Sequence, residues 1–367
     1  MRTIFINGRF LTQATTGVQR YAAELTLALD GLLGSEVISR TEYRVVLLVP
    51  RSARQDLPLE HIGVECVGRS GGHVWEQMDL RRYSGSRNAV LFNPGNTAPV
   101  GARNVVVTIH DAGVFATPEA YSLGFRTWYR LMHRNLSRHA QGLITVSEFS
   151  RQQLGEYTGA PASRFEVIPP GAEHIARLEA DKRILLRHGL GQRPFVLAVS
   201  SLNPNKNFKL IIDAMAYLPD LLGSVDFVIA GGTNPRIFRQ REVAPTPGIK
   251  YLGYVTDHEL KALYQEARAF VFPSLYEGFG LPPLEAMSCG CPAIVARSAS
   301  LPWVCGEAAL YCDPRDPRDL AQKIRTVACE EAVRTGLREK GLARAGDFTW
   351  PQCARSTFQL LDKLLAS

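Results

Sequence analysis

Short apolar runs alternate with amphipathic stretches along the whole of this 367-residue chain. Two of the amphipathic stretches, residues 19–34 and 207–219, have the apolar period of a helix. Short apolar runs bounded by turn residues are typical of buried strands. Such runs occur at 3–7, 43–49, 89–93, 104–110, 142–146, 164–168, 195–200, 226–232, 249–253, 269–274 and 292–296. Strands and helices that alternate in this way predict an α/β protein with parallel sheets.

The number of these runs exceeds one ordinary sheet, so we expect two Rossmann-like, doubly wound domains that face each other across a cleft. The boundary falls best after the run 164–168, where Pro169, Pro170 and Gly171 interrupt the pattern. The first domain is therefore expected at 1–172 and the second from 173 onward. Ligands of such sheets bind at the carboxyl ends of the strands, which is where candidate residues are sought.

Composition excludes several classes of protein. The net charge of +7 suits phosphate-bearing ligands or an anionic surface. The seven cysteines are an odd number without framework spacing, which indicates a reducing compartment. Cys289 and Cys291 lack a second pair at zinc-site spacing, so we expect no metal. No apolar run is long enough to span a membrane and the N-terminus lacks a signal-peptide core, whereas peripheral attachment stays open.

The segment YEGFGLPPLEAMSCGCP (276–292) holds two carboxylates eight positions apart on a strand-to-helix turn. We expect Glu277 on the loop and Glu285 in the first turn of the helix. Backbone N–H groups of Gly280 and Leu281 would then point at an anion. Glu277 could accept hydrogen bonds from hydroxyl groups, and Glu285 from two vicinal hydroxyls such as those of a ribose. The alternative is a pair of solvated glutamates.

Two strand ends in the first half carry candidates. Gly17 opens a helix after the first strand and would let its backbone approach a ligand. His110 ends the run 104–110 and could donate a hydrogen bond or act as an acid or base. The alternative for His110 is a histidine satisfied by its neighbour Asp111.

Two strand ends in the second half carry candidates as well. Lys206 follows the run 195–200 and could hold a phosphate, although a single loop lysine is more often solvated. Gly231 lies at the end of the run 226–232, where a ligand could come close to the backbone.

Together these segments resemble glycosyltransferase family 4, the retaining enzymes of GT-B fold, in which YEGFGLPPLEAM is the EX7E element. The resemblance extends over nearly the whole chain through TGVQRY, WEQ (75–77), VTIHD, TVSEFS, VIPPG, SSLNPNKN, YLGYV and GEAALYCDP. It implies that 350–367 is a closing helix that returns to the N-terminal domain, so that the donor-binding domain covers 173–349. The WEQ, HDAG and SEFS pieces are most similar to bacterial mannosyltransferase-like enzymes of O-antigen and exopolysaccharide assembly.

The resemblance also implies roles for residues. His110, Lys206 and Glu277 would be catalytic: His110 near the reacting carbon, Lys206 on the diphosphate and Glu277 on the sugar hydroxyls. The implied positions that bind the donor substrate are Gly17, Ser201, Lys206, Gly231, Tyr254, Val255, Glu277, Gly278, Phe279, Gly280, Leu281 and Glu285. Many relatives carry an arginine shortly before the lysine, where this chain has Ser200 and Ser201; Arg236 and Arg9 are the candidates for that charge.

The reaction expected from the resemblance is transfer of a hexose from a nucleotide sugar to a glycan or lipid-linked acceptor, with retention at the anomeric carbon. GDP-mannose is the expected donor substrate, and surface polysaccharide, including lipopolysaccharide, the expected product. The leaving phosphate would take the acceptor proton. Because no D-x-D motif occurs, no metal or other cofactor is expected. The expected location is cytoplasmic, with peripheral contact at the inner membrane.

Acceptor recognition is expected in the first domain. Arginines recur every four residues on one predicted helix face, flanked by aromatic residues. This arginine ridge consists of Arg126, Arg130, Arg134 and Arg138. It suits an anionic membrane or a polyprenyl-diphosphate acceptor, and the alternative is a solvated helix face.

Other functional classes remain open at this point. A nucleotide-sugar 2-epimerase shares such an architecture and would act without an acceptor. A non-catalytic subunit would bind the nucleotide sugar without turnover. A nicotinamide oxidoreductase is disfavoured because the first turn lacks G-x-G-x-x-G spacing.

Overall fold

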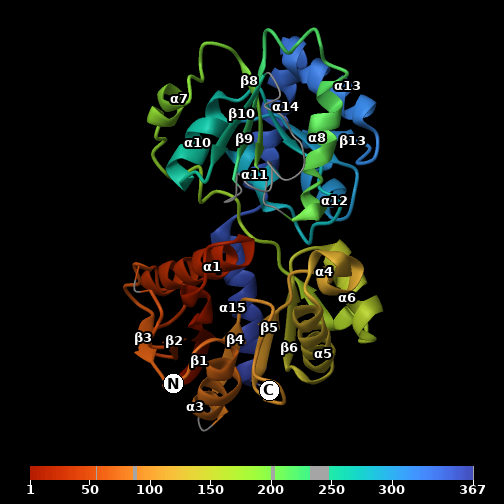
Figure 1. The fold of residues 1–367 in the computed structure, drawn as a ribbon. Helices are drawn as coiled ribbons and strands as arrows, with labels where there is room; N and C mark the ends of the chain where they lie inside the picture. The colour runs from red at the N-terminus through yellow and green to blue at the C-terminus, as the bar shows by residue number, and fades with distance from the viewer. Residues whose placement is uncertain (55, 86–88, 200–202, 232–247, 367) are drawn as a thin grey trace. The chain divides into compact units, whose positions relative to one another are not determined.

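The computed structural model describes residues 1–54, 56–85, 89–199, 203–231 and 248–366. The chain forms two compact units, Met1–Gly171 with Thr349–Ser367, and Ala172–Phe348. The expected boundaries, 172 and 349, lie one residue from these limits. Each unit is built on one parallel sheet accompanied by helices (Figure 1). The prediction of two Rossmann-like units is therefore confirmed.

The first unit has, within its described residues, a seven-stranded sheet of order β3-β2-β1-β4-β5-β6-β7. Its strands are β1 (Arg2–Asn7), β2 (Tyr43–Val49), β3 (Gly63–Cys66), β4 (Ala89–Asn93), β5 (Val105–Thr108), β6 (Gly142–Thr145) and β7 (Phe165–Val167). Its helices are α1 (Gly17–Gly34), α2 (Gly72–Val74), α3 (Arg81–Gly85), α4 (Gly113–Ala116), α5 (Leu123–His139), α6 (Glu148–Thr158) and α15 (Trp350–Ala366). A π-helical turn, Trp75–Leu80, joins α2 to α3, and 3-10 turns lie at Gly8–Thr12, Pro118–Ala120 and Ala162–Arg164.

The C-terminal helix α15 belongs to the first unit, as the resemblance implied. Trp350 is buried and its ring meets Tyr21 of α1 at a centroid distance of 5.9 Å. At the far end of α15, Asp362 pairs with Arg2 of β1 at 2.5 Å. The helix α15 also contacts β4 and β6, so it packs as part of the first compact unit.

The second unit has, in its described part, a six-stranded sheet of order β10-β9-β8-β11-β12-β13. Its strands are β8 (Phe195–Val199), β9 (Asp226–Ala230), β10 (Ile249–Gly253), β11 (Ala269–Phe272), β12 (Ala293–Ala296) and β13 (Ala309–Cys312). Its helices are α7 (Arg183–Arg187), α8 (Phe208–Met215), α10 (Asp257–Glu266), α11 (Leu281–Ser288), α12 (Leu301–Cys305), α13 (Pro317–Cys329) and α14 (Glu331–Gly346), with 3-10 turns at Pro204–Lys206 and Gly306–Ala308.

Both sheets reverse their strand order once. In the first unit the chain builds outward from β1 to β3 and then starts again on the other side with β4. In the second unit the same reversal falls between β8 and β11. Loops that leave neighbouring strands at such a switch point diverge to opposite faces and leave a crevice where ligands bind.

Two strands were not expected from the apolar pattern. The edge strand β3 is short and mostly exposed, so its sequence GVEC lacks an apolar run. The strand β13 lies inside GEAALYCDP, which the sequence analysis quoted only for its resemblance. Among the described residues, no helix combines the length and the apolar character needed to cross a bilayer.

Candidate active site

Lys206 and Glu277 meet at the switch point of the second unit. Lys206 ends the 3-10 turn after β8, and Glu277 lies on the loop after β11. Lys206 Nζ is 2.6 Å from Glu277 Oε1, and the ammonium also lies 4.9 Å from the centre of the Phe272 ring. The side chains are 24% and 14% exposed, so both are held in place and still reachable. The two residues predicted for diphosphate and sugar contacts are thus brought together.

Two serines fix the loop that carries Glu277. Ser274 Oγ lies 2.6 Å from Glu277 Oε1 and 2.9 Å from the Asn205 carbonyl oxygen. Ser300 Oγ lies 3.0 Å from the Glu277 carbonyl and 2.8 Å from that of Phe279. Because Asn205 and Ser300 lie outside this loop and Ser274 lies within it, the loop is tied to its surroundings and the carboxylate is oriented by the protein itself.

Gly280 gives α11 its entry geometry. Its φ of +98° lies in the region that side chains disfavour, and a Cβ there would sit 2.5 Å from Leu301 Cδ2. The helix then begins at Leu281, and the amides of its first turn have no partner within the helix. The turn at Gly280 therefore sets the direction of the first-turn N–H groups of α11, which suit an anion. The Phe279 side chain instead packs inside the unit, against Phe348 and Trp303.

Glu285 is displaced from its expected helical position. The sequence pattern placed it in the first turn of the helix. Since Gly280 caps the helix, α11 starts at Leu281 and Glu285 falls in the second turn, where it is 8% exposed. Its Oε1 is 3.0 Å from His174 Nε2, and its Oε2 is 3.5 Å from the Tyr264 hydroxyl. The carboxylate is thus placed between His174 and Tyr264, where it can accept hydrogen bonds from ligand hydroxyls.

The remaining residues expected around the donor substrate are partly described. Gly231 follows β9 with a φ of +92°, and its N–H donates to the Gly253 carbonyl at 2.7 Å. Tyr254 and Val255 follow β10, where the Tyr254 side chain is 77% exposed. The predictions for Ser201 and for Arg236 lie outside the described residues.

His110 is a neutral histidine in the first unit. It follows β5, is 8% exposed, and its ring packs edge-on against Tyr21 at 4.6 Å. Its Nε2 lies 2.9 Å from the Pro94 carbonyl, which can only accept, so Nε2 carries the hydrogen and Nδ1 keeps its lone pair. Burial lowers the pKa of His110 to about 4. The partner is therefore Pro94 and not Asp111, whose Oδ1 accepts from the Gly113 N–H at 2.7 Å.

Burial of neutral histidines predicts a pH dependence of stability. His133 is also buried, and burial lowers its pKa to about 4. The unfolded chain binds the proton near pH 6.5, so the free energy of unfolding falls as the pH drops from 6.5 towards 4. Between pH 7 and 5, the free energy of unfolding should fall by about 2 kcal/mol less in His133→Gln than in the wild-type protein. Urea unfolding at both pH values measures this difference. An equal fall in both proteins would contradict a buried, neutral His133.

Gly17 is the first residue of α1, after Thr16. A Cβ at Gly17 would meet no protein atom within 4 Å. The packing of the unit therefore does not require glycine here, in contrast to Gly280. An open helix start of this kind leaves room for a ligand to approach the backbone.

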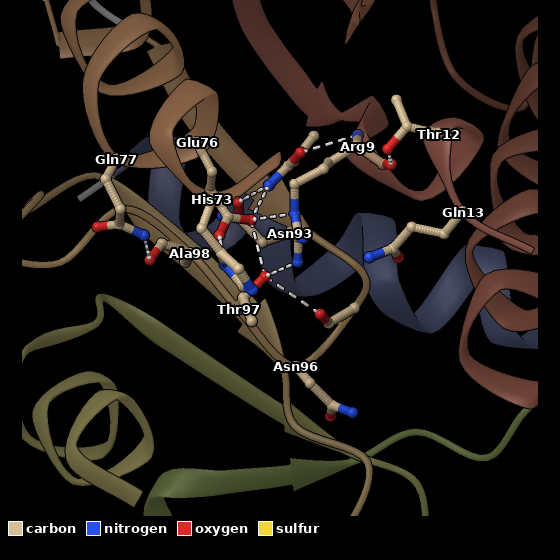
Figure 2. Close-up of polar contacts among 12 residues, drawn as sticks. Arg9, Thr12, Gln13, His73, Glu76, Gln77, Asn93, Asn96, Thr97 and Ala98 are labelled. Carbon is tan, nitrogen blue, oxygen red and sulfur yellow. Dashed lines mark hydrogen bonds and ion pairs between the residues drawn. The ribbon is translucent and has the colours of Figure 1, made fainter. Parts of the chain in front are cut away.

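A buried polar cluster that the sequence analysis did not predict lies at the switch point of the first unit (Figure 2). Glu76, in the π-helical turn, is fully buried, and its Oε1 accepts from Arg9 Nε at 3.2 Å and from Thr97 Oγ1 at 2.7 Å. Asn7 Nδ2 donates to the same oxygen at 2.8 Å and to Asn93 Oδ1 at 2.9 Å. Sequence reasoning had offered Arg9 only as a replacement charge and had quoted Glu76 only within WEQ.

The arginine ridge on α5 is only partly a free surface. Arg130 Nε donates to the Val114 carbonyl at 2.7 Å, and its guanidinium lies 5.6 Å from the centre of the Phe115 ring. Arg134 lies 5.5 Å from the same ring. Two of the four arginines therefore pack on α4, while Arg126 is half-buried and Arg138 exposed. The acceptor or membrane role of the ridge therefore stays a prediction.

Two family models match the chain. The model described as glycosyl transferases group 1 matches residues 185–344, which include Lys206 and Glu277. The model for glycosyltransferase family 4 matches residues 91–174, which include His110.

Relatives of assigned function are similar over most of the chain. The O-antigen chain mannosyltransferase B of Escherichia coli is 32% identical over 293 residues, which are 77% of this chain and 75% of that protein. The serotype-specific mannosyltransferase WbdA of Escherichia coli is 31% identical over 71% of this chain but over only 34% of its own length.

Solved structures share the fold. Sucrose-phosphate synthase from Thermosynechococcus elongatus has a TM-score of 0.75 at 18% identity and full coverage of both chains, 100% each. WaaG, a glycosyltransferase involved in lipopolysaccharide biosynthesis, has a TM-score of 0.71 at 15% identity, covering 98% of this chain and 99% of its own. Anabaena HepE, solved with UDP-glucose, has a TM-score of 0.72 at 19% identity, covering 99% of this chain and 100% of its own.

Proposed function

We propose, from the premise that this chain belongs to glycosyltransferase family 4, that it moves a hexose from a nucleotide sugar to an acceptor hydroxyl with retention at the anomeric carbon. The chain is a glycosyltransferase of GT-B fold, as the predictions of family and enzyme class stated. The observation that carries the mechanism is the contact of 2.6 Å between Lys206 and Glu277 at the switch point of the second unit.

In this mechanism each group has one task. Lys206 and the first-turn amides of α11 stabilise the charge that grows on the leaving diphosphate. Glu277 and Glu285 accept hydrogen bonds from the hydroxyls of the sugar and of the ribose. His110, neutral with Nδ1 unprotonated, accepts a hydrogen bond from a hydroxyl near the reacting carbon. The leaving phosphate takes the acceptor proton, so neither glutamate acts as a nucleophile, in contrast to paired carboxylates of retaining glycosidases.

The substrates follow from the relatives. Because both relatives described above are mannosyltransferases, and one of them acts on the O-antigen chain, we assign the chain to surface polysaccharide assembly with mannose as the transferred sugar and GDP as its carrier. The acceptor is then a saccharide or a lipid-linked saccharide on the cytoplasmic side. No metal is assigned to the reaction, because lysine and helix amides supply the charge that a divalent ion would supply elsewhere.

Proton NMR of the reaction tests this proposal. Purified protein with GDP-mannose and a mannoside acceptor should release GDP and form a product of the same anomeric configuration, at a rate unchanged by EDTA. An inverted product would contradict retention. A 2-epimer formed without acceptor would favour the epimerase alternative, and binding without turnover would favour a non-catalytic subunit.

The exposed part of α5 supports a peripheral membrane contact. Leu123, Phe125 and Trp128 are 68%, 41% and 39% exposed on the helix that also carries Arg126 and Arg138. Apolar side chains flanked by arginines suit an anionic bilayer surface. The protein should therefore sediment with vesicles that contain phosphatidylglycerol, and the double variant Arg126→Glu, Arg138→Glu should bind at least ~10-fold more weakly. Equal sedimentation of both proteins would contradict the contact.

A further inference from the structure

The polar cluster of the first unit borders a small cavity. Polar side chains on its wall come from the loop after β1, from α1, from the π-helical turn and from the loop after β4. They are those of Asn7, Arg9, Gln13, Gln19, Glu76 and Thr97. The cavity therefore lies at the switch point between β1 and β4, where this type of sheet binds ligands.

The cavity is small, with a volume of about 20 Å³. A space of this size takes roughly one water molecule. One hydroxyl group therefore fits, whereas a phosphate or a whole sugar ring does not.

The walls of the cavity carry no net charge. The Arg9 and Glu76 side chains are 8% and 0% exposed and form an ion pair, and Arg9 Nη2 also donates to Thr97 Oγ1 at 2.8 Å. Although burial alone would raise the pKa of Glu76, the nearby His73 and Arg9 groups and the Thr97 and Asn7 donors hold it below its ordinary value. Glu76 is therefore a carboxylate whose charge balances that of Arg9, so the cavity has no excess positive charge to hold an anion.

One buried acceptor of the cluster makes no hydrogen bond. The donor that faces Glu76 Oε2 is His73 Nδ1, which lies 3.6 Å away, beyond hydrogen-bond distance, and is itself without a hydrogen bond among the described residues. A buried carboxylate oxygen without a donor is costly and calls for an explanation. Glu76 also lies in a π-helical turn, a feature that is frequent at functional sites.

We infer that this cavity takes one hydroxyl group of a neutral acceptor sugar. A hydroxyl donates and accepts at once, so it can donate to the Glu76 carboxylate while it accepts from the Gln13 amide or the Arg9 guanidinium. A phosphate or carboxylate only accepts and would lie against Glu76. The inference rests on the proposed glycosyltransferase function and adds the chemical class of the acceptor group that the first unit recognises.

The test uses the full chain with GDP-mannose and the methyl glycosides of mannose, glucose, galactose and N-acetylglucosamine as acceptors. At least one glycoside should accept transfer, and one of its monodeoxy derivatives should react at least ~100-fold more slowly, because a site built for a hydroxyl rejects the analogue without it. Inorganic phosphate should not compete with that glycoside. Competition by phosphate, or transfer to none of the glycosides, would overturn the inference.

A variant of the wall separates recognition from folding. In Gln13→Leu the monodeoxy derivative should react less than ~10-fold more slowly than its parent glycoside, a rate ratio called here the monodeoxy penalty. The slow hydrolysis of the nucleotide sugar without acceptor should be unchanged. Gln77→Leu is the matched control, because Gln77 bonds the Ala98 carbonyl and the Val100 N–H and does not border the cavity. It should keep the wild-type penalty.

An unchanged penalty in Gln13→Leu, or an equal loss of the penalty in Gln77→Leu, would overturn the inference. Absence of both hydrolysis and nucleotide binding in the wild-type protein would instead show that the proposed function is wrong, and the inference with it.

Discussion

Lys206→Ala is expected to lower kcat/KM for sugar transfer by ~10²–10³-fold, the usual cost of removing one placed group that stabilises charge in the transition state. Lys206 Nζ is the cation next to the Glu277 carboxylate, at 2.6 Å. Glu277→Gln keeps the size of the side chain but removes its charge, and should cause a loss of similar size. Steady-state release of the nucleoside diphosphate, with thermal unfolding as a check of folding, measures both.

Lys209→Ala is the matched control for this prediction. Lys209 lies three positions further along, on α8, where it is 80% exposed and pairs with Asp213. An exposed pair of this kind contributes little, so the variant should keep wild-type activity and stability. Wild-type kcat/KM in both Lys206→Ala and Glu277→Gln would contradict the assigned site.

Gly280→Ala is expected to weaken nucleotide binding at least ~10-fold and to destabilise the protein by about 1–2 kcal/mol or more. The φ of +98° disfavours any side chain, and the new Cβ would lie 2.5 Å from Leu301 Cδ2. Relief of that clash must move either Leu301 or the start of α11. Because the start of α11 carries the amides assigned to the diphosphate, binding and stability should fall together.

Gly336→Ala serves as the control for Gly280→Ala. Gly336 lies within α14, and a Cβ there would meet no protein atom within 4 Å. Alanine has the higher helix propensity, so this variant should be slightly stabilised, by about 0.5–1 kcal/mol, with unchanged binding. Denaturant unfolding and calorimetry measure the two effects. Wild-type nucleotide affinity in Gly280→Ala would contradict the role assigned to the start of α11.

The apolar runs predicted the architecture because a parallel sheet buries both faces of its strands. Every apolar run that was expected to be a strand contains a strand of the structure. The edge strand β3 is exposed and therefore has no apolar run by which it could be predicted. The meeting of Lys206 and Glu277 was predictable in outline, since both follow strands and parallel strands end at one edge. Their direct contact was not, because it joins residues 71 positions apart.

The cluster around Glu76 shows where sequence reasoning fails. The Glu76 carboxylate accepts hydrogen bonds from Asn7, Arg9 and Thr97, which lie 69, 67 and 21 positions away in the sequence. No local spacing in the sequence indicates such contacts. A charged residue in a helical stretch is usually solvated, so a fully buried Glu76 contradicts the usual expectation. The sequence feature that could have indicated this cluster was the presence of polar residues at the ends of both β1 and β4, the strands that flank the switch point.

Calorimetric titration of the purified protein with GDP, UDP and dTDP tests the central claim most directly, namely that the Lys206–Glu277 site binds the nucleotide sugar. The account predicts saturable binding of one nucleotide class, GDP on the present assignment, and at least ~10-fold weaker binding to Lys206→Ala, because a charge-assisted hydrogen bond is worth about 1.5–3 kcal/mol. No binding of any of the three nucleotides, or equal affinity in the variant, would contradict it.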